Sequence, residues 1–278
     1  MKNVGYLTIA NALYLEIAGL LLYGLSKTSL LPRKLVTINC ESERRVENES
    51  YEQSLIENDS NKHCGLAKLT ALIKSPFDYT VFLDADTTPN INVDDLAELC
   101  CKRNWEFPLL PRHPNDQHDC TRYQGDNVYR PSMLKAFDCK LKTMPYGQSC
   151  VMLVSPRAKR WLADNHDFFL SGIERLGGTE ALPGFEEWPL NVLLWTHGAK
   201  QQLNYCCPAA RHLETYFDGR DYMMGLAHPE TPVTWQVLHG QKNPAKALEA
   251  VERLIGQDRE FFESHTYRRQ KPFVLDYA

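Results

Sequence analysis

A short apolar segment that ends in two aspartates constrains the fold of this chain more than any other feature. Residues 79–89 read YTVFLDADTTP, and the uncharged run up to Leu83 is typical of a buried strand that stops at a turn. In an α/β sheet, ligands bind beyond the carboxyl ends of the strands. Two carboxylates at that point suit Mg²⁺ or Mn²⁺ shared with a substrate phosphate. We therefore expect Asp84 and Asp86 to belong to a functional site, although an Asp-x-Asp sequence in a loop is often only solvated.

Composition narrows the class of protein. The chain has 278 residues, 43% of them hydrophobic and 24% charged, which is ordinary for a globular protein with a large core. Its formal net charge is −4 and no stretch forms a basic stripe, so nucleic acid is not the expected partner. A nucleotide bound through a metal ion needs little net positive charge.

The cysteines and the N-terminal region bear on location. The nine cysteines form an odd set with no Cys-x-x-Cys spacing, which favours a reducing compartment and therefore the cytoplasm, with peripheral attachment to a membrane left open. The apolar run over residues 18–25 lies between Glu16 and Lys27 and is shorter than the ~20 residues that a membrane span needs. We expect a buried helix there, with neither a signal peptide nor a transmembrane segment.

The first 110 residues predict alternating strands and helices. Strands are expected at 4–10, 35–39, the run before Asp84 and 105–110, and helices at 12–25, 66–73 and 94–103. This order predicts an open α/β sheet with helices on both faces. Residues 41–62 are interpreted as a surface helix and loop.

The second half is less regular. Strands are expected at 150–154, 202–206 and 234–239, helices at 157–165, 186–196 and 245–263, and polar loops at 111–130 and 211–231. Long irregular segments inside a compact domain tend to be functional loops.

Several short segments occur in an order that resembles one enzyme family. They are VFLDADT at 81–87, Lys68 sixteen residues before Asp84, GQSCVMLV at 147–154, EEWPLN at 186–191 and HGQK at 239–242. This set resembles the GT-A nucleotide-sugar glycosyltransferases, in particular the glycogenin-like, family 8-like group. The last segment is contracted relative to the group's His-x-x-Gly-x-x-Lys-Pro, and the insertion around residues 111–145 departs from the group and leaves the acceptor unidentified.

The resemblance implies an α/β fold of GT-A type, an open mixed sheet flanked by helices. Residues 1–245 would form the catalytic domain, and residues 246–278 a helical extension of the same domain. The implied activity is metal-dependent transfer of a sugar from a nucleotide-diphosphate donor, with UDP-sugar the first choice, to a glycan, a lipid-linked precursor or a protein. The implied metal ligands for Mn²⁺ or Mg²⁺ are Asp84, Asp86 and His239, with Asp84 reaching either the ion or the donor ribose.

The donor would contact residues on both sides of the carboxylate pair. The expected donor contacts are Thr8, Ala10, Asn11, Tyr14, Lys68, Asp84, Ala85, Asp86, Gln148, Ser149, His239, Gly240 and Lys242. Tyr14 is placed to stack on a uracil ring or, equally, to face the core of its helix. Other structural alternatives are a solvated Lys68, a simple turn over residues 147–149, and a structural role for His239.

The stereochemical outcome is not encoded in the sequence, and retention follows only from the resemblance. An inverting enzyme needs a general base near the acceptor, and the candidates are Glu186, Glu187 and Asp126. Glu186 has a structural alternative as a carboxylate at a helix N-terminus, where it would favour the helix dipole.

Three other classes of protein share parts of this pattern. A haloacid-dehalogenase-type phosphatase also carries Asp-x-Asp-x-Thr after a strand, but that motif normally ends the first strand, and here two strand–helix units precede it. A sugar-nucleotide nucleotidyltransferase usually has a glycine-rich basic loop after its first strand, which residues 11–14 do not form. A non-catalytic carbohydrate-binding module with a degenerate site is the third alternative.

Overall fold

A computed structural model describes most of the sheet and helix framework of the chain. The described residues are 3–38, 52–56, 65–89, 94, 97–98, 101–102, 104, 110–111, 135–138, 147–177, 187, 190–193, 209–215, 222–227, 235–240 and 242–255.

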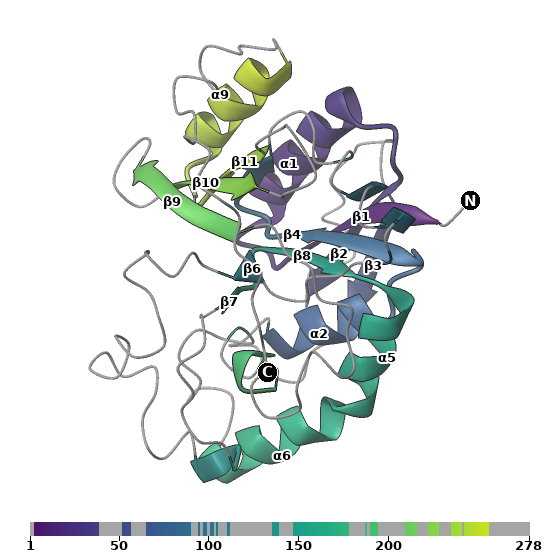
Figure 1. Cartoon of the computed structure of the whole chain (residues 1–278). Coiled ribbons are helices and arrows are strands. Elements are labelled where there is room, and N and C mark those ends of the chain that lie inside the picture. The colour runs from purple at the N-terminus through teal and green to yellow at the C-terminus, as the bar shows by residue number, and fades with distance from the viewer. Residues whose placement is uncertain are drawn as a thin grey trace.

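A five-stranded sheet forms the centre of this framework (Figure 1). Its strands follow the order β3 (Glu52–Ile56), β2 (Arg33–Ile38), β1 (Val4–Ala10), β4 (Tyr79–Leu83) and β8 (Val151–Val154). The first four strands are parallel, and β8 runs antiparallel to β4. The predicted mixed α/β architecture with an open sheet is therefore confirmed.

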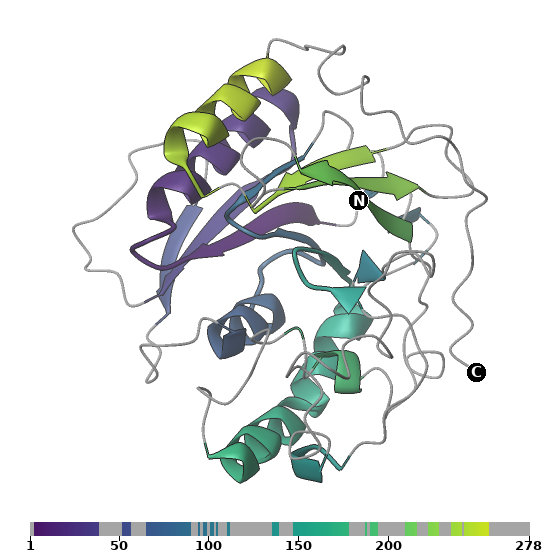
Figure 2. The ribbon, with the colours of Figure 1, turned by 90° about the vertical axis from the view of Figure 1, so that its left-hand side faces the viewer.

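Helices cover both faces of this sheet (Figures 1 and 2). On one side α1 (Leu15–Thr28) lies on the sheet, and α9 (Pro244–Ile255) runs alongside α1. The other side carries α2 (Gly65–Ile73) and α5 (Pro156–Asp164), and α6 (His166–Leu176) continues from α5 away from the sheet. None of the helices in the described part is long and apolar enough to cross a membrane.

The alternation of side chains along the strands builds two separate cores. In β1, Tyr6 packs in the cluster under α1, whereas Leu7 packs in the cluster under α2 and α5. In β4, Val81 and Phe82 divide between the two clusters in the same way. Because both faces are buried, these strands read as continuous apolar runs, which is the pattern that made them predictable.

Local signals explain where the helices begin and end. Ser155 caps α5 by accepting a hydrogen bond from the Ala158 N–H at 3.0 Å, and Pro156 occupies the first turn. Gly177 ends α6 in the left-handed conformation with φ of 88°, which glycine adopts without a side-chain penalty.

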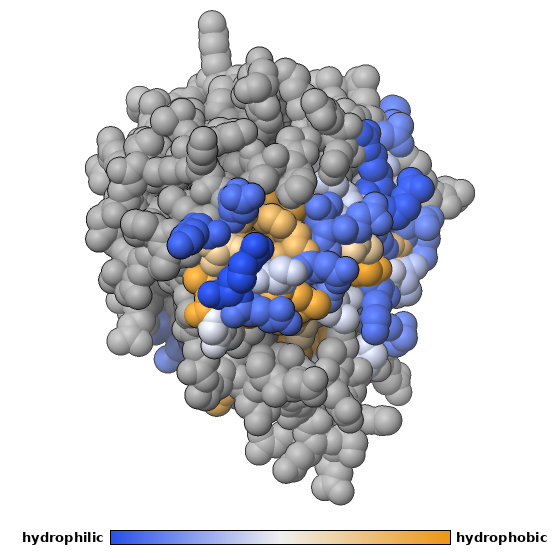
Figure 3. Space-filling model, turned by 90° about the horizontal axis from the view of Figure 1, so that it is seen from below, coloured by the Kyte–Doolittle hydropathy of each residue, from blue (hydrophilic) through white to orange (hydrophobic). Residues whose placement is uncertain are grey.

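Figure 3 shows the face on the α6 side, where hydrophobic and hydrophilic side chains of the described residues lie next to each other.

A second sheet lies beside the first and reaches the end of β4. Its order is β5 (Thr87–Pro89), β11 (Trp235–His239), β10 (Tyr222–Ala227) and β9 (Ala209–Thr215), all antiparallel. Two short strands, β6 (Leu110–Pro111) and β7 (Gly147–Gln148), pair separately. The second sheet therefore brings a late part of the chain to the Asp-x-Asp turn.

Three strands contradict the sequence predictions. Strand β3 falls within residues 41–62, which were predicted as helix and loop. Strand β10 falls within residues 211–231, which were predicted as loop, and β9 overlaps the start of that segment. These segments are strands because β3 bonds to β2, β10 bonds to β11 and β9 bonds to β10, and local composition does not reveal these pairings. The predicted strand at 202–206 and most of the one at 105–110 lie outside the described residues.

A polar cluster away from the Asp-x-Asp turn has a structural role. The Tyr6 hydroxyl donates a hydrogen bond to Asp94, and burial, with the Asp94 charge in second place, raises the pKa of Tyr6 well above its ordinary value. Arg33 donates to the backbone oxygens of Leu25, Ser29 and Leu31, and burial lowers its pKa. This cluster fastens the end of α1 to the sheet.

Candidate functional site

The turn after β4 is held by backbone and hydroxyl contacts that present its two carboxylates. The Asp84 carbonyl accepts from the Thr87 N–H at 3.1 Å and from the Thr87 hydroxyl at 2.6 Å. The Asp84 N–H donates to the Cys150 carbonyl at 2.9 Å, which continues the pairing of β4 with the chain before β8. Ala85 is buried, whereas Asp84 and Asp86 are partly exposed. The turn therefore has a fixed backbone and two carboxylates that solvent can reach.

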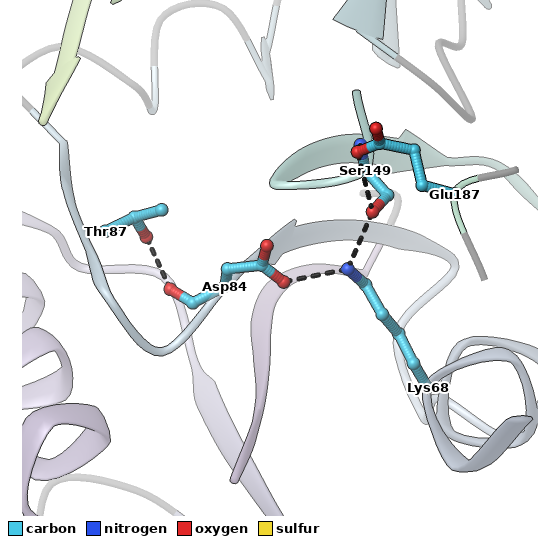
Figure 4. A network of polar contacts seen from close by, with 5 residues as sticks. All are labelled: Lys68, Asp84, Thr87, Ser149 and Glu187. Carbon is cyan, nitrogen blue, oxygen red and sulfur yellow. Dashed lines mark hydrogen bonds and ion pairs between the residues drawn. The ribbon is translucent and has the colours of Figure 1, made fainter. Parts of the chain in front are cut away.

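Lys68 reaches this turn from α2. Its Nζ lies 2.8 Å from Asp84 Oδ1, 3.1 Å from Ser149 Oγ and 4.4 Å from the centre of the Phe82 ring (Figure 4). Only 5% of Lys68 is exposed, so the alternative of a solvated helix lysine is excluded. A buried ammonium group requires compensating charge and acceptors, and these contacts supply both.

Ser149 connects Lys68 to a third carboxylate. The Ser149 N–H donates to Glu187 Oε2 at 3.0 Å, and its hydroxyl lies 3.5 Å from the same oxygen (Figure 4). The Asn191 side chain donates to the Glu187 carbonyl at 2.7 Å, and Asn191 is almost completely buried. Ser149 is therefore part of a polar network, so this segment is not only a turn.

His239 comes to the same turn through strand pairing. In the β5–β11 ladder His239 lies opposite Thr87, and the next residue, Gly240, donates its N–H to the Asp86 carbonyl at 3.0 Å. Gly240 has φ of 91°, a conformation that favours glycine. The predicted neighbourhood of His239 and Asp86 is therefore present at the level of the backbone.

The expected nucleotide contacts lie at the end of β1, next to the end of β4. Lys242 is exposed, and its Nζ lies 5.6 Å from the centre of the Tyr14 ring, which is partly buried. The Asn11 side chain accepts from the Leu13 N–H at 3.1 Å. Thr8 and Ala10 are 1% and 3% exposed, so both are buried, and their contact with a donor stays a prediction.

The chemistry of the donor set fits a hard divalent cation. Two carboxylates from one turn and an adjacent strand that carries a histidine are a donor combination that Mn²⁺ or Mg²⁺ accepts. Within the described side chains, no three His, Cys, Asp or Glu residues are grouped closely enough to hold an ion. The structure describes the backbone of His239, and a third ligand would come from its side chain or from undescribed residues.

Three of the predicted site residues have little or no described structure, and one contact of the site was not predicted. Glu186 and Asp126 lie outside the described residues, and Gln148 is placed only as part of β7, opposite Leu110. The role of the Thr87 hydroxyl in holding the turn was not predicted, although its spacing after Asp84 is the signal of a side chain that bonds a nearby backbone group.

Comparison with known proteins does not place this chain in a family. No model of a known protein family matches the chain, and no curated protein matches it. The class that the fold and the site define is a mixed α/β protein with a carboxylate site at the ends of its central strands.

Proposed function

We propose that this chain is a metal-dependent glycosyltransferase of GT-A type that takes a sugar from a nucleotide-diphosphate donor, with UDP-sugar the first candidate. One observation carries the proposal: the Asp84–Asp86 turn and the β11 segment with His239 and Gly240, far apart in sequence, are hydrogen-bonded to each other. These are the segments that resemble the metal-binding motifs of the glycogenin-like group.

A divalent ion held by Asp86 and His239, with Asp84 as a further ligand or a ribose contact, would neutralise charge that develops on the leaving nucleoside diphosphate. The side chains of this chain have the remaining tasks. Lys242, at the same edge of the sheet, adds positive charge where the diphosphate would lie, and the ring of Tyr14 offers a surface for the base. Lys68 holds Asp84, Ser149 holds Lys68, and both residues would lie on the expected sugar side.

The position of Asp84 in the chain supports this role over that of a phosphatase nucleophile. The Lys68 contact to Asp84 Oδ1 is compatible with both roles, because a carboxylate has a second oxygen. The site forms at a strand preceded in the chain by β1, β2 and β3, whereas the phosphatase motif normally follows the first strand.

The proposed glycosyltransferase function includes a cellular compartment and a class of acceptor. The odd set of nine cysteines without Cys-x-x-Cys spacing supports a reducing compartment such as the cytoplasm. The acceptor would be a glycan, a lipid-linked precursor or a protein.

The test is release of nucleoside diphosphate from UDP-, GDP- and TDP-sugars, in Mn²⁺ and in EDTA. Slow release from one donor that requires metal supports the proposal and names the sugar. Hydrolysis of small phosphate esters without release from any sugar donor would replace it by the phosphatase class. Binding of a sugar donor without turnover under any condition would favour the non-catalytic module.

A further inference from the structure

The carboxylate of Glu187 is not directed to solvent as an isolated acid. Its Oε2 accepts from the Ser149 N–H at 3.0 Å and lies 3.5 Å from the Ser149 hydroxyl. The Glu187 backbone is itself fixed, because the buried Asn191 amide donates to its carbonyl at 2.7 Å. Because one of its oxygens accepts this hydrogen bond, the Glu187 carboxylate orients the backbone at Ser149.

A series of contacts links Glu187, through Ser149 and Lys68, to the Asp-x-Asp turn. Ser149 Oγ accepts from the Lys68 ammonium at 3.1 Å, which leaves its proton available for Glu187, and Lys68 reaches Asp84 Oδ1 at 2.8 Å (Figure 4). Ser149 is 4% exposed, and Lys68 is 5% exposed. Charge-assisted hydrogen bonds in so dry an environment are stronger than at the surface.

We propose that Glu187 is a positioning residue that, through Ser149, holds Lys68 against Asp84 and so orients the carboxylate of the metal site. The metal part of this inference rests on the proposed function, whereas the positioning of Lys68 does not. Glu187 therefore has a task that differs from that of a general base, for which the sequence also made it a candidate.

The chemistry of the contact separates these two tasks. Glu187→Gln keeps a side-chain oxygen that can accept from the Ser149 N–H, but it has no basic carboxylate. Glu187→Ala removes the acceptor and leaves a buried Ser149 N–H without it. Positioning predicts that Gln rescues what Ala loses, and base catalysis predicts that it does not.

The first experiment measures the accessibility of the Lys68 amine. The intact chain is treated with an acylating reagent such as an N-hydroxysuccinimide ester, and labelling of each lysine is followed by mass spectrometry. In Glu187→Ala we expect Lys68 to be labelled about tenfold faster, the factor that corresponds to one lost charge-assisted hydrogen bond. In Glu187→Gln the rate should stay close to that of the unchanged chain.

Controls and a second variant keep the experiment decisive. Lys242 is exposed and should be labelled equally in every variant, and Glu252→Ala on the exposed side of α9 should leave Lys68 protected. Ser149→Ala removes the hydroxyl contact to Lys68 while it keeps the N–H, and should also increase Lys68 labelling. Unfolding midpoints identify any variant whose labelling reflects global unfolding. If Glu187→Ala does not fold, Glu187→Met replaces it, because methionine also lacks the acceptor oxygen but fills the volume of the side chain.

The second experiment measures Mn²⁺ affinity without donor, from the paramagnetic resonance signal of free Mn²⁺. Weaker binding in Glu187→Ala that Glu187→Gln restores supports the effect on the metal site. Lys68 protection that is equal in Glu187→Ala and the unchanged chain would overturn the positioning. Absence of Mn²⁺ binding in the unchanged chain would overturn the proposed function and the metal part of the inference, while the labelling result still stands.

Discussion

The ammonium group of Lys68 and the carboxylate of Asp84 form an ion pair whose two members differ in burial. The atoms lie 2.8 Å apart, but 6% of the Lys68 side chain is exposed and 27% of the Asp84 side chain. Water can compensate the carboxylate if the lysine is removed, whereas it cannot reach the lysine if the carboxylate is removed. The two single substitutions should therefore have unequal effects on stability.

We expect Asp84→Asn to lower the free energy of unfolding by about 3 kcal/mol, because it leaves a buried ammonium group without that counter-ion. Lys68→Met keeps most of the aliphatic volume and leaves only a partly exposed carboxylate, so its cost should be about 1 kcal/mol. Urea unfolding measures both. The surface pair Lys34–Glu52 is the control, since breaking it through Lys34→Met should cost about 0–1 kcal/mol. Equal losses for Asp84→Asn and Lys68→Met would contradict the argument from burial.

Asp86→Ala is the cleaner test of the metal site. The contact that ties this residue to Gly240 uses the Asp86 backbone carbonyl, which alanine keeps. We therefore expect a fold of nearly unchanged stability and a fall of at least about a hundredfold in metal-dependent nucleoside diphosphate release, since a catalytic metal contributes several kcal/mol. Normal release by the variant would remove Asp86 from the mechanism.

Thr8 and Thr80 form a matched pair of buried threonines. The Thr8 hydroxyl finds no hydrogen-bond partner among the described residues, whereas the Thr80 hydroxyl lies 2.7 Å from Ser75 Oγ. Thr8→Val should therefore leave stability unchanged or raise it by about 1 kcal/mol, and Thr80→Val should lower it by about 1 kcal/mol. Thermal or urea unfolding distinguishes the two. A large loss in Thr8→Val would reveal a partner for its hydroxyl, and weaker UDP binding would support the predicted base contact.

The ring of Tyr14 should matter for donor binding through its face and not through its hydroxyl. Tyr14→Phe keeps both the surface for the base and the contact with Lys242, so calorimetry should give a nearly unchanged affinity for UDP. Tyr14→Ala should weaken binding by about 1–3 kcal/mol, the value of one base–aromatic stack. If Tyr14→Ala binds UDP normally, Tyr14 packs only within the protein.

Several elements of the fold could be predicted because their signals are local. Strands β1, β2, β4, β8 and β11 and helices α1, α2 and α5 agree with the sequence analysis to within a few residues. Strands β3 and β9 were missed because their residues are mixed, and β10 was missed because its short apolar run lies in a segment that is polar as a whole. Each becomes a strand by pairing with a neighbouring strand. The helix α6, which follows α5 directly, was not predicted either.

The candidate site was likewise predictable only in part from the sequence. The sequence indicated Lys68, Asp84, Ser149 and Glu187 one by one, and it left a structural alternative open for Lys68, Asp84 and Ser149. That they form one connected network is visible only in the fold, since α2, the end of β4, the turn before β8 and the helix turn at Glu187 supply one member each.

By itself the sequence determined that a buried strand ends in two carboxylates and that strands and helices alternate around it, because hydrophobic periodicity is a property of neighbouring residues. The tertiary structure alone decided which partner each polar side chain has. A buried charge such as Lys68 is stable only beside compensating groups, and the segments that supply them are brought together by the packing of the sheet and its helices.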